Sequence, residues 1–187
     1  MRARTSEYGM RTVIAIAIIM GAAPLGPAVA LAQGPGARTQ LPGIDLPILL
    51  DTMAVRFDVK GSEPPIIDAA ARAFKELEIP VEAQDPRAGR IRNLRVEKSR
   101  RLGGVQMSRY FDCGRGFSGP NADVYRLTLA VSTWVEPGSA DTRKLAVAVA
   151  ATGQDMAGAR NDHVLCSSTG RLETRIAERV NALLTSP

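Results

Sequence analysis

Two alternating stretches near the middle of the chain constrain the fold more than any other feature. The first has large apolar side chains at nearly every second position. These are Tyr125, Leu127, Leu129, Val131 and Val135. The second, residues 145–150, alternates Leu or Val with Ala146, Ala148 and Ala150. A period of two is typical of a strand with one buried face, and Pro137-Gly138 between the stretches favours a turn. We therefore expect a central antiparallel hairpin with a flat alanine face, on which a neighbouring segment can lie closely.

Shorter patterns predict three further strands. They are expected at residues 52–60, 91–97 and 105–111. In the second of these the alternation slips near Asn93. Gly103-Gly104 marks the turn before the third strand. Together with the central hairpin, these segments predict an antiparallel sheet of about five strands.

Two helices are predicted from apolar residues at helical spacing. Ser62 is suited to cap the first, which tolerates Pro64 and Pro65 in its first turn and is expected to end near Glu78. The second is expected near the C-terminus, with Ser167 or Ser168 as its cap. Its apolar stripe consists of Leu172, Ile176, Val180, Leu183 and Leu184. The order β-α-β-β-β-β-α predicts an α+β fold with both helices packed on one face of the sheet.

The first 32 residues have the pattern of a secretory signal peptide. Three arginines form a basic leader, and residues 12–23 supply an apolar core that is too short to span a bilayer. Ala30-Leu31-Ala32 has the small residues that signal peptidase requires, so cleavage is expected near Ala32. The alternative is an uncleaved N-terminal anchor. With cleavage, we expect an exported periplasmic or secreted protein, soluble and without a transmembrane segment in the mature chain.

The mature chain is expected to have two parts. Residues 33–50 are rich in Gly and Pro, a composition that resists regular structure and favours an extended arm, either a tether or a segment that covers a sheet edge. Residues 51–187 are expected to form a single α+β domain.

The chain contains two cysteines, Cys113 and Cys166. An exported protein meets oxidising conditions, so a structural disulfide between them is expected. The alternative is a redox or nucleophilic pair, but the two cysteines do not form a C-x-x-C motif and no candidate base lies beside Cys113.

One segment resembles a known family. Residues 66–91 read IIDAAARAFKELEIPVEAQDPRAGRI, a predicted helix, a short strand, a turn containing Asp and a Gly before the next strand. This order resembles the helix-grip domains of bacterial envelope accessory proteins such as the BamC-like lipoproteins. The chain departs from those lipoproteins because no lipobox cysteine stands at the predicted cleavage site. The resemblance implies a helix-grip-like fold and a binding or scaffolding role in the cell envelope, without catalysis.

A run of seven cations between residues 87 and 101 is the main electrostatic anomaly. Its members are Arg87, Arg90, Arg92, Arg95, Lys98, Arg100 and Arg101. On a strand, Arg90 and Arg92 would share a face. Such a patch is suited to anionic lipid headgroups or an acidic partner, whereas the structural alternative is a solvated edge whose charge prevents further strand pairing. Nucleic acid is not an expected partner, because the run lacks interleaved aromatic residues.

No catalytic, cofactor or metal site is expected. His163 is the single histidine, and Asp162-His163-x-x-Cys166 supplies too few ligands for zinc if Cys166 is oxidised. Ser118 lies in no G-x-S-x-G motif. Trp134 and Tyr110 are expected to be packing residues, although they could also line a cavity.

The sequence therefore favours an exported, non-catalytic module that binds a protein of the bacterial cell envelope. The alternative is a carrier that holds a small apolar ligand between its C-terminal helix and its sheet. An enzyme is not expected.

Overall fold

The computed structural model describes residues 38–85, 88–139, 141–156 and 162–186. All of them belong to one unit, Gln33–Pro187. The predicted signal peptide with its cleavage near Ala32, residues 33–37 of the predicted arm, and Arg87 lie outside the described residues.

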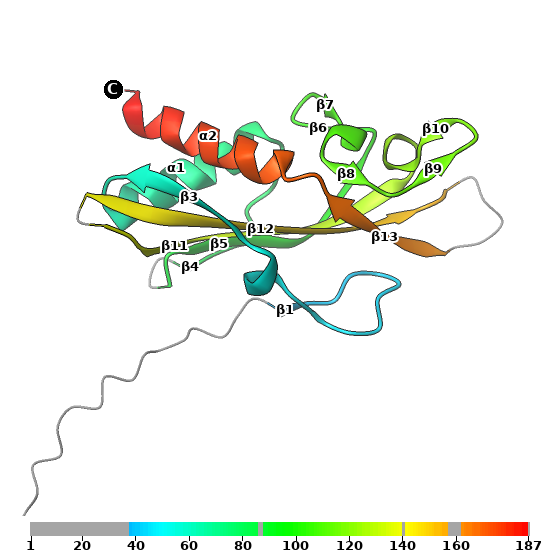
Figure 1. The fold of residues 1–187 in the computed structure, drawn as a ribbon, viewed down its shortest axis with the longest axis horizontal. Helices are drawn as coiled ribbons and strands as arrows, with labels where there is room; N and C mark the ends of the chain where they lie inside the picture. Colours follow the sequence, from blue (N-terminus) through cyan, green and yellow to red (C-terminus); the bar gives the residue numbers. More distant parts are fainter. Residues whose placement is uncertain (1–37, 86–87, 140, 157–161, 187) are drawn as a thin grey trace, which may run out of the picture. The chain divides into compact units, whose positions relative to one another are not determined.

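The predicted hairpin is the centre of the sheet. Strand β11 (Arg126–Pro137) pairs antiparallel with β12 (Thr142–Gln154) from Arg126 opposite Gln154 to Pro137 opposite Arg143. Strand β5 (Arg90–Ser99) pairs with the other edge of β11, and β4 (Ala83–Asp85) pairs with β5. Figure 1 shows these strands as one continuous layer. The large apolar side chains of β11 and β12 lie on one face, in the core, as predicted, but the opposite face of both strands is buried as well.

The outer edge of β12 is shared by two strands. Strand β3 (Val55–Lys60) pairs with residues 142–147, and β13 (His163–Ser168) pairs with residues 151–154. Strand β8 (Phe111–Asp112) pairs with the end of β13. The antiparallel sheet therefore has seven strands rather than the predicted five. Strand β13 was not predicted, and β4 lies where the resemblance alone indicated a short strand.

The register of β5 shifts in the middle of the strand. Leu129 of β11 lies opposite Val96, but Val131, two residues further on, lies opposite Asn93. One extra residue of β5 is thus accommodated by a bulge. This confirms the slip in alternation predicted near Asn93, whose side-chain amide donates to the carbonyl of Pro80 at 2.9 Å.

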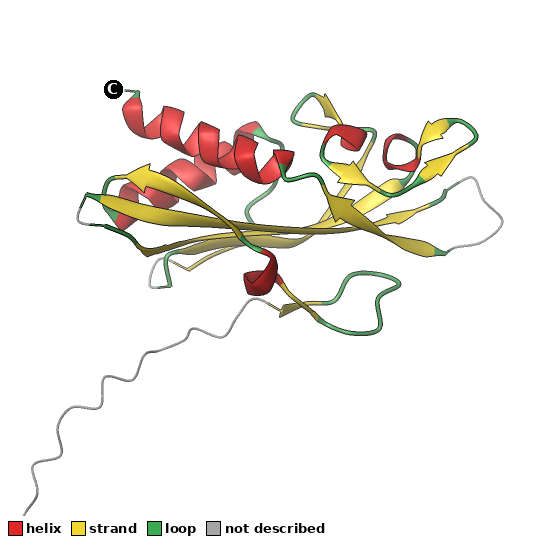
Figure 2. Ribbon diagram, in the orientation of Figure 1, coloured by secondary structure: helices red, strands yellow, loops and turns green. Residues whose placement is uncertain are grey.

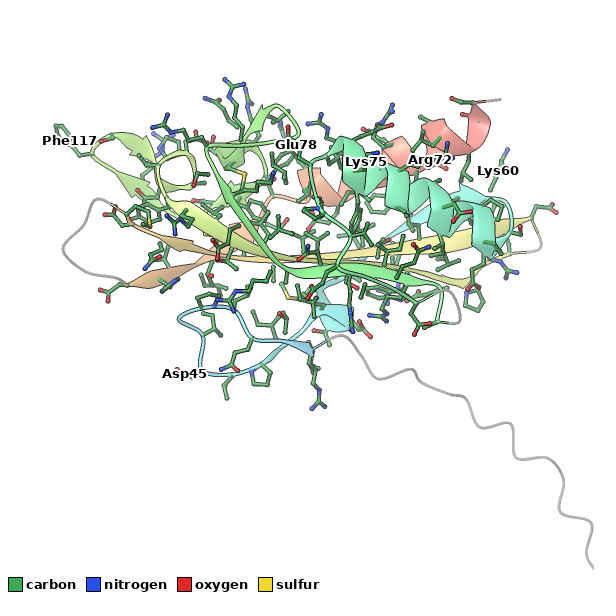
Figure 3. The ribbon with its side chains drawn as sticks, turned by 180° about the vertical axis from the view of Figure 1, so that it is seen from behind. Asp45, Lys60, Arg72, Lys75, Glu78 and Phe117 are labelled. Atoms are coloured by element: carbon green, nitrogen blue, oxygen red, sulfur yellow. A yellow bond between two sulfur atoms is a disulfide. The ribbon has the colours of Figure 1, made fainter. Side chains whose placement is uncertain are left out.

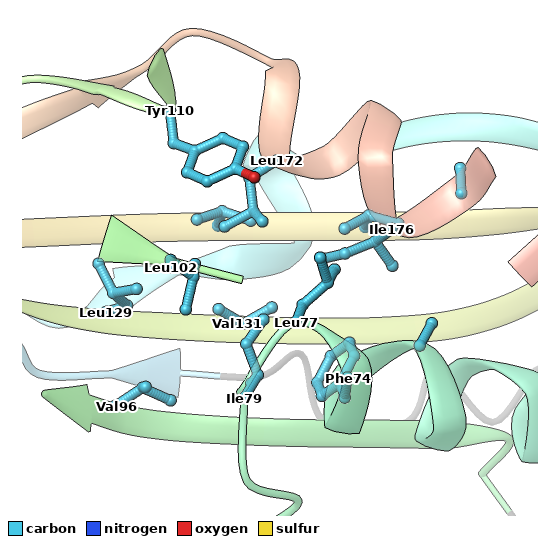
Figure 4. Close-up of a cluster of buried hydrophobic side chains, with 14 of the residues drawn as sticks. Phe74, Leu77, Ile79, Val96, Leu102, Tyr110, Leu129, Val131, Leu172 and Ile176 are labelled. Atoms are coloured by element: carbon cyan, nitrogen blue, oxygen red, sulfur yellow. The ribbon is translucent and has the colours of Figure 1, made fainter. Parts of the chain in front are cut away.

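Both helices lie on one face of the sheet, as predicted (Figure 2). Helix α1 (Glu63–Glu76) has prolines in its first turn, where no backbone N–H is needed, and α2 (Arg171–Thr185) packs against it. We call this side of the sheet the helix face. Its core combines buried apolar side chains from both helices and the sheet (Figure 4). They include Phe74, Leu77, Val96, Leu129, Val131, Leu172 and Ile176.

The opposite side of the sheet is covered by the described part of the N-terminal arm, so we call it the arm face (Figure 1). The arm forms two short paired strands, β1 (Arg38–Thr39) and β2 (Ile48–Leu49), followed by a 3-10 helix, η1 (Leu50–Met53). Leu41 and Leu50 are buried in one cluster with Ala130, Ala146, Ala148, Ala150 and Trp134. This segment covers a face of the sheet and not an edge, because the alanines leave room for it there.

Two local predictions are wrong. Residues 105–111 do not form one strand: they form β7 (Val105–Gln106), the 3-10 helix η2 (Met107–Arg109) and the start of β8. Ser167 and Ser168 belong to β13, where they pair with β8, and Gly170 caps α2 instead. Gly170 has a φ of 79°, a conformation that favours glycine.

Candidate functional site

The predicted basic stretch is divided between different surfaces. On the arm face, Arg90 pairs with Asp51 at 3.0 Å, and its guanidinium lies 4.4 Å from the ring centroid of Trp134. Its side chain is only 15 % exposed. Arg90 therefore has a structural role, since it fastens the arm to the sheet.

The other cations of the stretch do not form one patch with Arg90. Lys98 lies 3.5 Å from Glu78 at the end of α1, and the guanidinium of Arg101 donates to the carbonyl of Gly104. The side chains of Arg92, Arg95 and Arg100 are exposed. Strand alternation, the bulge and the turn after β5 distribute these charges over both faces and the turn.

The predicted disulfide is present, with the Sγ atoms of Cys113 and Cys166 2.06 Å apart. The pair continues the β8–β13 ladder by one position beyond Asp112 opposite Ser167. The two Cα atoms are 4.3 Å apart, a spacing close to that of directly opposed residues in an antiparallel pair. Both cysteines are buried. The bond thus joins the segment that follows β8 to the sheet.

Residues 101–123 form a module of short elements on the helix-face side of the sheet, beyond the end of the helices (Figure 1). Besides β7, η2 and β8, the module contains β6 (Arg101–Leu102), β9 (Arg115–Gly116), β10 (Gly119–Pro120) and η3 (Asn121–Asp123). We call it the clip module because the disulfide clips it to β13.

Arg175 of α2 also holds the clip module. Its guanidinium donates to the hydroxyl of Tyr110 and, at 3.1 Å, to the carbonyl of Gly103. Tyr110 is 2 % exposed and packs in the core above Leu172 (Figure 4). The prediction that Tyr110 is a packing residue is thus confirmed, and so is that for Trp134, which is 7 % exposed.

The clip module contains an open groove of about 610 Å³. Its lining includes Gln106, Ser108, Arg109, Asp112, Arg115 and Asp123. Each carboxylate already accepts a backbone N–H: Asp123 from Ser108 at 2.9 Å and Asp112 from Gly114 at 2.8 Å. In contrast, neither guanidinium has an ion-pair partner among the described residues. The groove is therefore suited to an anionic group that can accept hydrogen bonds from Arg109 and Arg115.

The β9–β10 hairpin rises beside this groove. Gly116 lies opposite Gly119, so the loop consists of only Phe117 and Ser118. Phe117 is fully exposed, and Figure 3 shows it at the outer end of the hairpin. Asn121 secures the base: its backbone N–H donates to Gly114, and its side-chain amide donates to Cys113.

His163 lies in β13, opposite Gln154. Gly43 of the arm approaches it so closely that a Cβ atom there would lie 2.4 Å from the His163 Cβ. His163 therefore belongs to the contact between the arm and the sheet.

Sequence reasoning missed the residues that the structure brings together in the clip module. Arg109, Arg115 and Phe117 stand in no recognisable motif, and of the predicted basic run only Arg101 belongs to the clip module. The available signal was the glycine-rich composition around Phe117, which leaves an aromatic residue among residues typical of turns.

In the part of the chain that the structure describes, His, Cys, Asp and Glu side chains form no group of three that could hold a metal ion. Neither described helix combines the length and the apolar character needed to cross a bilayer. No model of a known protein family matches this chain, and no curated protein matches it either.

Proposed function

We propose that the chain is an exported, non-catalytic binding module of the bacterial cell envelope, and that the clip module carries its binding surface. The observation that supports this most directly is the groove. Two arginines line it without an ion-pair partner among the described residues, while both of its aspartates are engaged by backbone amides. An anionic envelope component would supply the acceptors that the arginines lack.

Export is the part of this proposal that depends on the N-terminal sequence. It is supported by the signal-peptide pattern of residues 1–32 and by a disulfide that requires oxidising conditions to persist. The mass of the protein purified from the envelope fraction of cells under non-reducing conditions tests it. We expect a chain that begins at Gln33 and is two hydrogens lighter than the dithiol. A full-length, reduced chain in the cytoplasm would contradict export.

The binding surface is tested separately by photo-crosslinking in cells. A photoreactive residue in place of Gln106, which lines the groove, should form adducts with an envelope component. The same residue in place of Arg72, which is exposed on α1, serves as the control (Figure 3). Adducts at position 106 should disappear when Arg109 and Arg115 are both changed to Glu. Equal adducts at positions 106 and 72 would contradict a binding role for the groove.

The carrier alternative has less support. The side chains between α2 and the sheet are closely buried: Leu172, Ile176 and Val180 of the helix and Leu145 and Val147 of β12 are all 0 % exposed. Native mass spectrometry of the purified protein would revive this alternative if a small molecule remained bound.

A further inference from the structure

Phe117 is the most exposed large apolar side chain among the described residues. It contacts no core cluster, so its ring contributes nothing to the stability of the fold. A phenylalanine that stays in water forgoes the free energy that burial would provide. A single exposed apolar side chain is common on protein surfaces. What distinguishes this ring is its place at the tip of a hairpin beside two groove arginines that have no ion-pair partner among the described residues.

The base of the hairpin that carries Phe117 is held by contacts within the chain. The two hydrogen bonds of Asn121 to residues 113 and 114 secure its base, and the disulfide secures Cys113 itself. A Cβ atom at Gly116 would lie 2.8 Å from the side-chain oxygen of Asn121, so a larger residue at the neck would force that side chain to shift. A short loop on such a base loses little conformational freedom when it binds.

The neighbours of Phe117 favour a lipid surface over a protein pocket. The other residues of the tip, Gly116, Ser118 and Gly119, offer no second apolar anchor. A stable protein interface needs about 800 Å² from each partner and a cluster of buried anchors. A single projecting ring is better suited to insertion between lipid headgroups, because its small neighbours do not obstruct that insertion sterically.

Charge supports the same choice. The clip module and the preceding residue contain four arginines, at positions 100, 101, 109 and 115, against two aspartates, at positions 112 and 123. Arg115 lies two residues before Phe117 in the same hairpin. At about 3.3 Å per residue, Phe117 is about 7 Å closer to the tip of the hairpin than Arg115 is. The apolar face of an interfacial helix reaches about 5–10 Å into the boundary between headgroups and acyl chains, a depth similar to this offset. Arg115 would thus remain level with the lipid phosphates.

We propose that the clip module docks on an anionic lipid bilayer, with Phe117 inserted among the headgroups and with Arg115 and Arg109 binding lipid phosphates. This inference rests on the proposed function and specifies its partner as a membrane surface.

The test uses the mature chain, residues 33–187, with Phe117→Trp as an internal probe. Trp134 is the only other tryptophan, and it is buried on the arm face, so it supplies a constant background. We compare two kinds of vesicle. The first contains phosphatidylcholine alone, and the second also contains about 40 % phosphatidylglycerol, an anionic lipid that gives the vesicle a negative surface potential. We expect binding to the anionic vesicles only, a blue shift of the emission, and quenching by bromine-labelled acyl chains.

Matched variants separate insertion from simple charge attraction. Phe117→Ser in the otherwise unchanged mature chain should weaken vesicle binding by about tenfold or more, because burial of the ring is lost. Leu46→Ser, at a 77 % exposed position of the arm, should leave it unchanged. Arg115→Glu should abolish binding at physiological salt.

Each outcome has a distinct meaning. Equal binding by the Phe117→Ser variant and the unchanged chain would overturn insertion. A second contrary outcome is that free inorganic phosphate competes fully with vesicles and that brominated chains cause no quenching. The groove would then bind a soluble anion, and the membrane proposal would be overturned. No vesicle binding, together with groove adducts to an envelope protein in cells, would overturn the inference and leave the proposed function standing.

Discussion

The two faces of the central sheet are built from the same two strands, yet they are covered in different ways. On the helix face, β11 and β12 present Leu and Val, and two amphipathic helices pack over them. On the arm face, the same strands present Ala130, Ala146, Ala148 and Ala150 with Trp134, and an irregular segment covers them. One alternating pattern therefore produces one face of large side chains and one face of small side chains.

The difference shows how side-chain size selects the covering layer. Large side chains hold a helix at a distance and interdigitate with its own apolar stripe. Alanine leaves the backbone of the sheet accessible, so that an extended segment with a few leucines can lie directly on it. The helix face should therefore contribute most of the stability, and the arm face should be the more easily opened of the two.

The largest effect is expected from a cavity on the helix face. Leu172→Ala removes a side chain that is 0 % exposed below Tyr110 and should lower the free energy of unfolding by about 3–5 kcal/mol. Urea unfolding measures it, with Arg171→Ala at an exposed position of the same turn as the control. A loss below about 1 kcal/mol, typical of surface substitutions, would show that this face is not the main core.

The same substitution on the arm face sharpens the comparison. Leu50 is also 0 % exposed, but it lies in a short 3-10 helix, which we expect to shift and fill part of a cavity. Leu50→Ala should cost about 2 kcal/mol, the lower end for a buried leucine. If urea unfolding showed a loss as large as that of Leu172→Ala, the arm would be as integral to the fold as the helices.

An added side chain on the alanine face should displace the arm. Ala148→Leu places a large group in the cluster that contains Leu41 and Leu50, at a cost of about 1–3 kcal/mol. Limited proteolysis should then cut within residues 38–53 while the rest of the chain resists. Ala88→Leu, at an exposed position, is the control. Unchanged proteolysis of the Ala148→Leu variant would contradict close packing of the arm.

The smallest effect concerns an ion pair at the end of the arm face. The guanidinium of Arg56 donates to Glu136 at 2.8 Å, and together with the indole N–H of Trp134 it lowers the pKa of the Glu136 carboxyl below its ordinary value. The stabilisation is complete above the ordinary pKa of glutamate and is lost as pH falls through the lowered value. Because both side chains are partly exposed, it should be below about 1 kcal/mol.

An NMR titration of the Glu136 carboxyl measures this effect directly. Its midpoint should lie below the ordinary pKa of a glutamate and should return toward that value when Arg56 is changed to Ala. In the unchanged protein this pair contributes to the loss of unfolding free energy at low pH, and in the Glu136→Gln variant that contribution should be absent. A midpoint at or above that of an exposed glutamate would contradict the interaction.

Much of the fold could be predicted because its strongest signals are local. The hairpin of β11 and β12, both helices, the bulge near Asn93 and the disulfide follow from periodicity, turn residues and the number of cysteines. Strand β13 could not be predicted, because Ser167 and Ser168 favour a helix cap when considered alone. In the structure their backbones pair with β8, and the adjacent disulfide stabilises that pairing.

The candidate site was less predictable. Seven cations close together in the sequence indicated one patch, but Arg90 is held by Asp51 and Trp134 on the arm face. The groove instead combines Arg109, Arg115 and Thr169, which belong to three different elements or connections. Nothing in the sequence around each residue indicates that the other two are near.

The sequence by itself determined which side chains of each strand point to the same face, where the chain turns, and which cysteines can pair. These properties follow from the geometry of short segments and from the chemistry of single residues. Only the tertiary structure decided that the arm covers the alanine face, that the cations of β5 are separated, and that Arg109, Arg115 and Phe117 share one module. Contacts between distant segments depend on competition among many possible partners and on the entropy of closing each loop, and neither is encoded in any local pattern.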